Sequence, residues 1–284
     1  QNATLTVAGD TTFTANHATA QINLSLGSSN PFDANGTYAN NFAGTVTLAR
    51  NNSNTGFTNV YLRNINASAS VLTGLTSVGT LSNVSLYFQN APSVTLPGMT
   101  LTGSLRVNAP GVVNTATIPG NQITQTGPIV VAGDTIFAAG STGDIDLSNA
   151  DNDFANFGIS NTGARNVTLI DKNAVVLYAP GYHQGITGDY TVTAGGTISD
   201  VQYNLSITGT ATLNAGSNNI MLTGSNFSAG VLAIPAANNV SINPVNNANL
   251  GNIAITGSLN LSARNVGALT QVASTSVVTG SPST

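Results

Sequence analysis

The chain has 284 residues and a net charge of −4, and only 6% of its residues are charged, against roughly 25% in ordinary soluble domains. Its six cations are too few and too scattered to form the basic surface that nucleic acids need, and no run of about 18 apolar residues predicts a membrane helix. The absence of cysteine excludes disulfides and thiolate metal sites.

Alternating apolar residues predict short β-strands from the N-terminus onward. In Gln1–Ala67 they stand at Leu5/Val7, Phe13, Ile22/Leu24/Leu26, Val46/Leu48 and Val60/Leu62. Strict alternation indicates a strand with one buried face, and the Asn, Gly, Ser and Thr residues between the pairs favour turns. The Asn- and Gly-rich insert near 28–41 is predicted to be a loop that leaves the strands.

The middle of the chain continues the pattern at shorter intervals. Between Ala69 and Pro119 it runs through Val71, Leu81, Val84/Leu86/Phe88, Val94/Leu96 and Leu105/Val107. The stretch Gly127–Tyr178 has the clearest alternation, with pairs at Ile129/Val131, Ile145/Leu147, Phe157/Ile159, Val167/Leu169 and Val175/Leu177. Turn residues at roughly every 8–12 positions are typical of a chain made of many short strands.

Beyond the middle, a loop is predicted near 179–188, where the sequence reads APGYHQGITG. The pattern resumes at Tyr190/Val192, Leu205/Ile207, Ile220/Leu222, Val240/Ile242 and Leu259/Leu261. A loose tail is predicted over 274–284, which is mostly Ser and Thr. No helix is predicted, because Glu is absent, Lys172 is the only lysine, and no long segment has apolar residues at a period of about 3.6.

One phrase recurs along the chain and predicts how the strands are arranged. Leu5–Ala15 reads LTVAGDTTFTA and Ile129–Ala139 reads IVVAGDTIFAA, and looser copies are Leu101–Ala109, Leu205–Ala215 and Ile253–Ala263. A repeated strand–Gly–strand unit must stack on others, because one copy cannot bury its apolar residues alone. We therefore predict a single all-β solenoid domain over 1–284, with about a dozen rungs of about 20–25 residues each. A β-sandwich is the alternative, although it does not explain why the phrase returns.

Several longer phrases resemble the interior repeats of filamentous haemagglutinin-like exoproteins, the large adhesins of two-partner secretion. They are ITQTG at Ile123–Gly127, VAGDTIFAAG at Val131–Gly140, IDLSNADNDF at Ile145–Phe154, NVTLIDKNAVVL at Asn166–Leu177 and NNFAGTVTL at Asn40–Leu48. The resemblance implies a right-handed parallel β-helix, a Gram-negative cell surface and the role of an adhesin shaft. The Asn-Pro pairs at Asn30 and Asn243 lie away from the start, so the amino-terminal secretion domain of that family is not recognisable.

The most tempting cluster for chemistry consists of Asp144, Asp146, Asp151 and Asp153. Since the apolar residues between them face inward, alternation places Asp144 and Asp146 together on the outer face. Their oxygens could hold Ca²⁺, or could form the acid–base pair of a β-helical polysaccharide-cleaving enzyme. A solvated strand edge with an Asx-rich turn explains the same residues. We expect this structural role, with no catalytic, cofactor-binding or metal-binding residue in the chain.

Histidines and Gly-Asp pairs offer weaker patterns. His17 and His183 stand far apart, without the neighbouring groups that a catalytic triad or a metal site needs. Gly9–Asp10 and Gly133–Asp134 do not form phosphate loops, because no Gly-rich run with a lysine opens a helix.

Patterns of tyrosine, threonine and asparagine residues each allow two interpretations. Tyr178 and Tyr182 could form a sugar-stacking surface, although such residues more often cover a loop. Outward threonine pairs resemble an ice-binding ladder without its constant spacing; they stand at Thr4/Thr6, Thr45/Thr47 and Thr191/Thr193. Asn-x-Ser/Thr triplets such as Asn66–Ser68 and Asn166–Thr168 match the glycosylation acceptor pattern, but their number is expected by chance in a chain so rich in Asn, Ser and Thr.

The expected function is that of an extracellular structural or adhesive rod without catalytic activity, which contacts cell-surface glycans, proteins or other rods. The chain begins at Gln1 without a signal peptide, so we expect a mature product or an excised fragment. It is either a shaft segment of a large adhesin or a filament subunit joined end to end through the strand-like segments Asn2–Ala8 and Val272–Thr279.

The alternative is a polysaccharide-binding or polysaccharide-cleaving β-helix. Such a protein would gather clustered aspartates and some of the cations in one groove. The cations are Arg50, Arg63, Arg106, Arg165, Lys172 and Arg264. They are dispersed in the sequence, and only stacking of the turns could bring some of them together.

Overall fold

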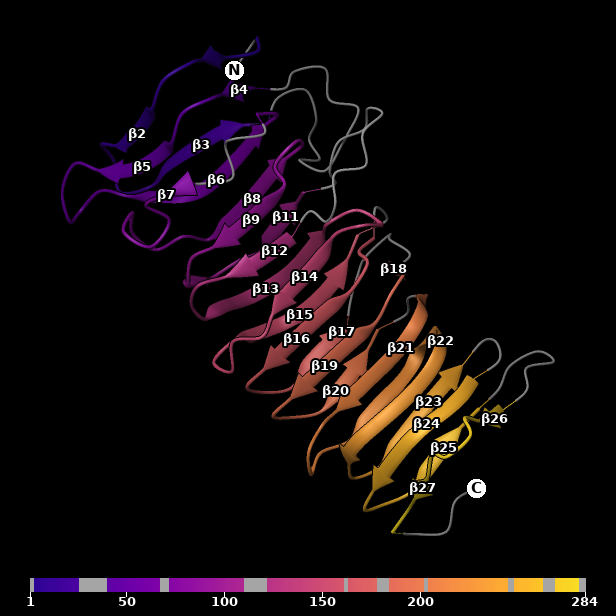
Figure 1. The fold of residues 1–284 in the computed structure, drawn as a ribbon. Helices are drawn as coiled ribbons and strands as arrows, with labels where there is room; N and C mark the ends of the chain where they lie inside the picture. The colour runs from indigo at the N-terminus through magenta and orange to yellow at the C-terminus, as the bar shows by residue number, and fades with distance from the viewer. Residues whose placement is uncertain are drawn as a thin grey trace.

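In the computed structural model the chain is a coil of parallel strands that advances from one end to the other (Figure 1). The structure describes residues 3–25, 40–66, 72–109, 122–160, 163–177, 184–201, 204–244, 248–262 and 269–280. These residues contain no helix, and therefore no helix long and apolar enough to cross a membrane. Every strand pairing among them is parallel. This confirms the predicted β-solenoid and rules out the β-sandwich, whose sheets are antiparallel.

The first turns are built by nine strands in which apolar and polar residues alternate. They are β1 (Thr6–Val7), β2 (Thr11–Ala15), β3 (Ala20–Leu24), β4 (Asn41–Phe42), β5 (Val46–Arg50), β6 (Phe57–Asn64), β7 (Leu72–Thr73), β8 (Asn83–Phe88) and β9 (Ser93–Leu96). In β5, for example, Val46 and Leu48 are buried, and Thr47 between them is partly exposed. This alternation is what turns one face of each strand toward the interior.

The middle of the coil contains the segment with the clearest alternation. Its strands are β10 (Met99–Leu101), β11 (Leu105–Asn108), β12 (Gln122–Gln125), β13 (Ile129–Ala138), β14 (Asp144–Leu147), β15 (Asp153–Ile159), β16 (Val167–Asp171), β17 (Val175–Leu177) and β18 (Gln184–Ile186). The β-branched and aromatic residues of these strands fit a pleated, half-buried surface.

The last turns have the same construction. Their strands are β19 (Tyr190–Ala194), β20 (Ile198–Asp200), β21 (Leu205–Asn214), β22 (Ile220–Ala237), β23 (Val240–Pro244), β24 (Ala248–Ile255), β25 (Leu259–Leu261), β26 (Leu269–Gln271) and β27 (Val277–Val278). The long strand β22 bends around corners, and register shifts mark the bends.

One ladder of parallel strands runs the length of the coil. It joins eleven strands in order: β3, β6, β8, β11, β13, β15, β17, β20, β22, β23 and β25. Val60 lies opposite Val84, and Val84 opposite Leu105. A second ladder starts at β9 and passes through β12, β14, β16, β19, β21, β22 and β24 to β26. Because each strand completes its hydrogen bonding only in the next turn, the turns stabilise one another.

The number of turns is smaller than the predicted dozen. The regular coil, from β8 to β25, makes about eight turns. Some turns take many more residues than predicted. The pairing of Ile22 with Val60 and that of Leu105 with Thr135 show this. Elsewhere the predicted turn length is confirmed, as where hydrogen-bonded asparagine side chains are 24 or 20 residues apart. Chain length alone therefore overestimates the number of turns.

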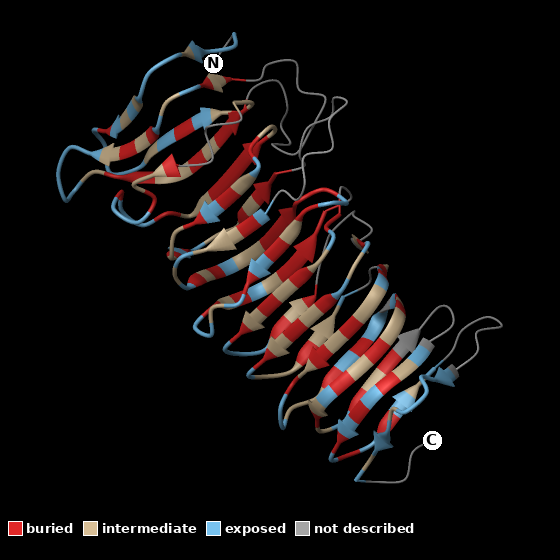
Figure 2. Cartoon of the chain, in the orientation of Figure 1, coloured by how far each residue is buried: buried red, intermediate tan, exposed pale blue. Residues whose placement is uncertain are grey.

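A single hydrophobic core fills the coil (Figure 2, buried residues in red). Val131 and Ile207 are 1% and 2% exposed, and Val7 packs against the same core from the first turn. In the middle, the ring centroids of Phe137 and Phe154 each lie 5.8 Å from that of Phe157. The predicted shared interior is therefore present, and burial of its apolar surface at about 25 cal/mol per Å² is the main source of stability.

Polar side chains at the corners hold one turn to the next. The Asn166 N–H donates to Asp144 (N···Oδ1 3.1 Å), the Asp189 N–H donates to Asn166 (N···Oδ1 2.9 Å), and the Thr210 N–H donates to Asp189 (N···Oδ1 2.8 Å). The chain passes close to this column at Gly188, where an added Cβ would lie 2.2 Å from Asn166 Oδ1. Side chains that satisfy backbone groups of the next turn fix the register of the stack.

The copies of the recurring phrase do not all lie against one another. The copy at 101–109 pairs directly with the copy at 129–139, with Leu101 opposite Val131 and Val107 opposite Phe137. The copy at 5–15 pairs instead with 41–50, and the copy at 205–215 with 227–236. The phrase therefore encodes a bent strand, and different copies occupy different corners.

The predicted loops overlap strands at their ends. Residues 28–39 of the first loop and 179–183 of the second lie outside the described residues. Asn41 begins β4, and 184–186 form β18, which pairs with Leu205–Ile207. Alternation failed to predict β18 because Ile186 is its only large apolar residue.

Part of the predicted loose tail belongs to the coil. Val277 and Val278 form β27 and lie opposite Ile253 and Ala254 of β24. Parallel pairing holds this segment although both of its side chains are exposed. Residues 281–284 lie outside the described residues.

Candidate functional site

Strand β14 carries the acidic pair that the sequence singled out. Its two apolar residues are buried and its aspartates face outward, as alternation predicted. Arg165 Nε donates to Asp144 Oδ1 over 2.8 Å, and Arg165 Nη2 pairs with Asp144 Oδ2. The amide Nδ2 of Asn166 donates to the same carboxylate over 3.0 Å. These hydrogen bonds, that of Arg165 above all, hold the pKa of Asp144 below its usual value.

The other aspartates of the cluster lie apart from this pair. Lys172 Nζ lies 3.1 Å from Asp153 Oδ2 in an ion pair whose side chains are 43% and 33% exposed, so it contributes little to stability. Asp151 is exposed, and its N–H donates to the Asn149 side chain. Among the described residues, no three His, Asp or other metal-ligating side chains gather around one position. Of the acidic pair on β14, only Asp146 has a carboxylate without a described partner, whereas Ca²⁺ takes about six to eight oxygen ligands.

Asp146 lies in a polar hollow on the outside of the coil. This hollow, called the Asp146 hollow below, has a volume of ≈ 290 Å³ and is lined by Thr124, Gln125, Thr126, Asp146, Ser148 and Asn149. Every lining side chain carries an oxygen, and only Asp146 is charged. No described residue donates a hydrogen bond to the Asp146 carboxylate or forms an ion pair with it. The hollow therefore presents an exposed acceptor surrounded by hydroxyl and amide groups.

Gln125 joins the Asp146 hollow to a buried amide network. Its Nε2 donates to Asn152 Oδ1 over 2.8 Å, and Asn152 Nδ2 donates back to Gln125 Oε1 over 2.9 Å. Asn152 is fully buried, accepts from the Ile129 N–H (2.9 Å), and donates to the carbonyls of Leu147 (3.0 Å) and Ile170 (3.2 Å). One side chain thus holds three consecutive turns, and it fixes one wall of the hollow in place.

Outward-facing threonines form columns along the coil. Thr95 lies opposite Thr124, with their hydroxyl oxygens 3.1 Å apart. Farther along, register aligns Asp146, Thr168, Thr191 and Thr212. The uneven spacing of the threonines in the sequence is taken up at the corners, so alignment in space is better than the sequence suggested. Asp146 adds a charge to this column, whose other members named here carry hydroxyl groups.

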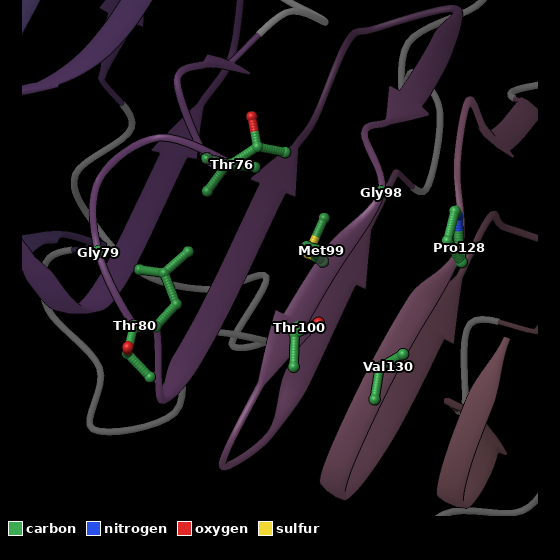
Figure 3. A pocket seen from close by; sticks show the side chains of 10 residues that line it. Thr76, Gly79, Thr80, Gly98, Met99, Thr100, Pro128 and Val130 are labelled. Atoms are coloured by element: carbon green, nitrogen blue, oxygen red, sulfur yellow. The ribbon is translucent and has the colours of Figure 1, made fainter.

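A larger hollow lies beside β10 and β13 (Figure 3). Its volume is ≈ 570 Å³, and it is lined by Leu75, Thr76, Gly79, Thr80, Leu81, Gly98, Met99, Thr100, Pro128 and Val130. Threonine hydroxyls and apolar groups share its surface, and no lining residue is charged. It therefore lacks any acid or base.

The remaining predicted candidates have local partners. His17 is exposed, and its Nδ1 lies 3.1 Å from Thr19 Oγ1. Asp10 accepts a hydrogen bond from the Thr45 N–H over 2.8 Å, and Asp134 accepts one from the Asn156 side chain over 3.0 Å. The Gly-Asp pairs thus lock neighbouring turns together. His183, Tyr178, Tyr182 and Arg264 lie outside the described residues.

The cations that the structure describes do not gather around one group of aspartates. Arg63 is buried with its guanidinium carbon 4.8 Å above the centre of the Tyr87 ring. Arg106 lies in β11, and Arg50 ends β5. Arg165 and Lys172 form ion pairs, each with a different aspartate. The pairing of Arg165 with Asp144 spans 21 residues, so sequence reasoning could have found it only by knowing the register.

The two ends of the coil are formed by strands that each pair on one side among the described residues. At the N-terminal end these are β1, β2 and β3, and at the C-terminal end β25, β26 and β27. Hydrophobic residues that pack against the core but stay partly exposed all lie near the ends: Val7, Phe13, Ala20, Leu24, Leu250 and Leu261. Val278 is 58% exposed. Both strand-like terminal segments named by the sequence thus contain a described strand, β1 and β27.

A comparison with known protein families finds one family whose repeats match this chain. A family model described as repeats of unknown function (DUF5649) matches residues 81–159, 164–234 and 237–283. The three matches span more than half of the chain and coincide with the regular coil that begins at β8. No curated protein and no solved structure matches the chain.

Proposed function

The chain belongs to the family of DUF5649 repeats, and we propose that it serves as a stiff extracellular rod on a bacterial cell surface, adhesive rather than catalytic. The observation that carries the proposal is the ladder of eleven parallel strands around one core. With neighbouring strands about 4.8 Å apart, this ladder alone is about 50 Å long. Bending such a rod would break ladder hydrogen bonds and open the core, so the geometry favours a stiff spacer.

The exterior supports an adhesive role. Only 6% of the residues are charged, and hydroxyl and amide side chains repeat from turn to turn on the outside. Each such group makes a weak contact, but groups that repeat along a rigid surface act together on a repetitive ligand. The resemblance to filamentous haemagglutinin-like exoproteins is the reason for proposing a location on the bacterial cell surface and a role as a shaft within a larger adhesin.

A non-catalytic role is supported by how the carboxylates are used. Asp144 is paired with Arg165, and Asp10 and Asp189 accept backbone hydrogen bonds from the next turn. Asp171 is 1% exposed and accepts from the N–H groups of Phe154 (2.6 Å) and Asn173 (2.8 Å). Burial raises the pKa of Asp171, but this carboxyl group lies away from solvent. General acid–base catalysis needs a carboxyl group that is free to exchange a proton with a substrate, whereas each of these carboxylates is engaged by another group of the protein.

Two measurements test the proposal. Small-angle X-ray scattering of the purified chain should give an elongated particle with a constant cross-section, and a compact sphere would contradict the rod. Antibodies against the chain should label intact, unpermeabilised cells, and the purified chain should bind cells or arrayed glycans. Labelling that requires permeabilisation would refute the extracellular role.

A second function, as a filament subunit, is favoured by the partly exposed hydrophobic residues at both ends. Open strand edges pair readily with other chains, so the C-terminal end of one copy could stack on the N-terminal end of the next. Light scattering over a concentration series should then reveal growing assemblies, and Val278→Lys should reduce their mass. Val201→Lys is the matched control, because Val201 is 43% exposed but lies in the middle of the coil. A monodisperse monomer at all concentrations would refute end-to-end assembly.

A further inference from the structure

We propose that the Asp146 hollow binds one neutral sugar unit of a glycan, with the Asp146 carboxylate accepting hydrogen bonds from two adjacent hydroxyl groups. This inference rests on the proposed adhesive function and names its ligand class and site. The hollow, ≈ 290 Å³ in volume, is near the lower limit of small-molecule sites and suits a single ring rather than a long chain.

The first argument is the state of the carboxylate. Among the described aspartates, most accept hydrogen bonds from neighbouring turns or pair with a cation, whereas no described group occupies the oxygens of Asp146. The carboxylate of Asp151 also has no described partner, but Asp151 does not line the hollow. A carboxylate accepts several hydrogen bonds and can receive two hydroxyl groups at once. Hydrogen bonds to a charged acceptor are about twice as strong as neutral ones. Asp146 is therefore the group best suited to recognise a pair of sugar hydroxyls.

The second argument is the complementarity of the lining. The Oδ1 of Asn149 accepts the Asp151 N–H over 2.9 Å, which fixes the amide and leaves its Nδ2 hydrogens as donors without a described partner. A sugar hydroxyl both donates and accepts, so it can donate to Asp146 while its oxygen accepts from Asn149. Thr126 and Ser148 add hydroxyl groups to the lining. Gln125 is fixed by its two hydrogen bonds to buried Asn152, so this wall is organised before a ligand arrives.

The third argument excludes other small ligands. An anion would meet the Asp146 charge without any cation in the lining. A divalent cation would find one carboxylate, because Asp144 is held by Arg165 and Asn166. A neutral polyol avoids both problems. The larger hollow near Thr100 has no charged acceptor and only threonine hydroxyls for polar recognition, so it lacks the strong hydrogen bonds that orient a sugar ring.

The test begins with an array of neutral oligosaccharides that end in glucose, galactose or mannose, probed with the full chain. The methyl glycoside of the sugar that binds is then titrated, with saturation-transfer NMR as the readout because a single open site binds weakly. Asp146→Asn keeps the shape of the side chain but loses its charge, and we expect about a tenfold or greater loss of affinity. Asp151→Asn is the matched control, since Asp151 is an exposed aspartate on the same turn that does not line the hollow.

Four outcomes decide the matter. Loss in Asp146→Asn, with binding unchanged in Asp151→Asn and in the presence of EDTA, supports the site. Equal loss in both variants, or loss on adding EDTA, overturns it, because the effect would then be one of net charge or of a metal ion. Unchanged binding in Asp146→Asn would mean that the ligand binds elsewhere. This result overturns the site but not the adhesive function. If the chain binds neither cells nor any arrayed glycan, the adhesive function itself fails.

Discussion

Replacing Asn152 with alanine should weaken the coil strongly, because this one uncharged side chain joins three consecutive turns. The change removes hydrogen bonds to Gln125, to the Ile129 N–H and to the carbonyls of Leu147 and Ile170, all around a fully buried position. Each buried group left without a partner costs about 1–3 kcal/mol. Water that enters the vacated space restores part of this loss, so we expect the free energy of unfolding to fall by about 3–5 kcal/mol.

The assay for this variant must report on local as well as global stability, because long repeat arrays can unfold in parts. Urea denaturation gives the global change, and hydrogen exchange of the Ile129 amide gives the local one. Asn260→Ala is the control, since Asn260 is exposed on β25, and it should change stability by no more than about 0.5 kcal/mol. If the two variants unfold at the same urea concentration and Ile129 stays protected, the view that buried corner amides hold the turns together is refuted.

Three further substitutions test other parts of the account. Asp144→Asn should lower the free energy of unfolding at neutral pH and make that free energy fall less as the pH is lowered. The pKa of Asp144 is lowered in the folded protein, so the stabilisation by its carboxylate is present above the unfolded pKa and is lost as the pH falls through the folded pKa. Urea midpoints between neutral and acidic pH check this, and an unchanged acid limb would speak against the Arg165 pairing. Phe157→Ala should cost about 3–5 kcal/mol, because the ring is fully buried against Phe137 and Phe154; a cost below about 1 kcal/mol would contradict the packed core. Gly188→Ala should destabilise through the clash of its Cβ with Asn166 Oδ1, measured as a lower melting temperature, and a neutral result would mean that this corner can relax.

Alternation of apolar residues was sufficient to predict an all-β chain, and the recurring phrase predicted that its strands stack. The pairs at Ile145/Leu147 and Val167/Leu169 lie in consecutive turns of one core, and Ile145 lies directly opposite Val167. Each pair is a local signal, because side chains of a strand point alternately to opposite faces. β18 was missed for the same reason, since a strand with a single large apolar residue gives no alternation to detect.

Contacts between turns could not be predicted, because they depend on register. Asp144 looked like one half of a pair with Asp146, two residues away, whereas its partner is Arg165 in the next turn. Insertions change the number of residues per turn, so a fixed period in the sequence does not mark equal positions in space. For the same reason the sequence predicted neither the corner each copy of the phrase occupies nor the alignment of Thr95 with Thr124.

The sequence predicted only part of the Asp146 hollow. Alternation correctly placed Asp146 on the outer face, but it gave no reason to prefer this aspartate over Asp144. The distinction comes from Arg165 and Asn166, which reach Asp144 from the neighbouring turn. The absence of a partner at Asp146 can be recognised only when the contacts between neighbouring turns are known.

The stacking of successive turns can be tested most directly with paired cysteines, since the chain has none of its own. Thr95→Cys and Thr124→Cys would occupy opposite positions on adjacent strands about 4.8 Å apart, within the Cα separation that a disulfide spans. Thr124→Cys and Thr191→Cys would lie on β12 and β19, which are three strand spacings, or about 14 Å, apart along the second ladder. We predict that mild oxidation links the first pair and leaves the second as free thiols. Linkage of both pairs, or of the second alone, in the folded protein would contradict a coil of stacked turns.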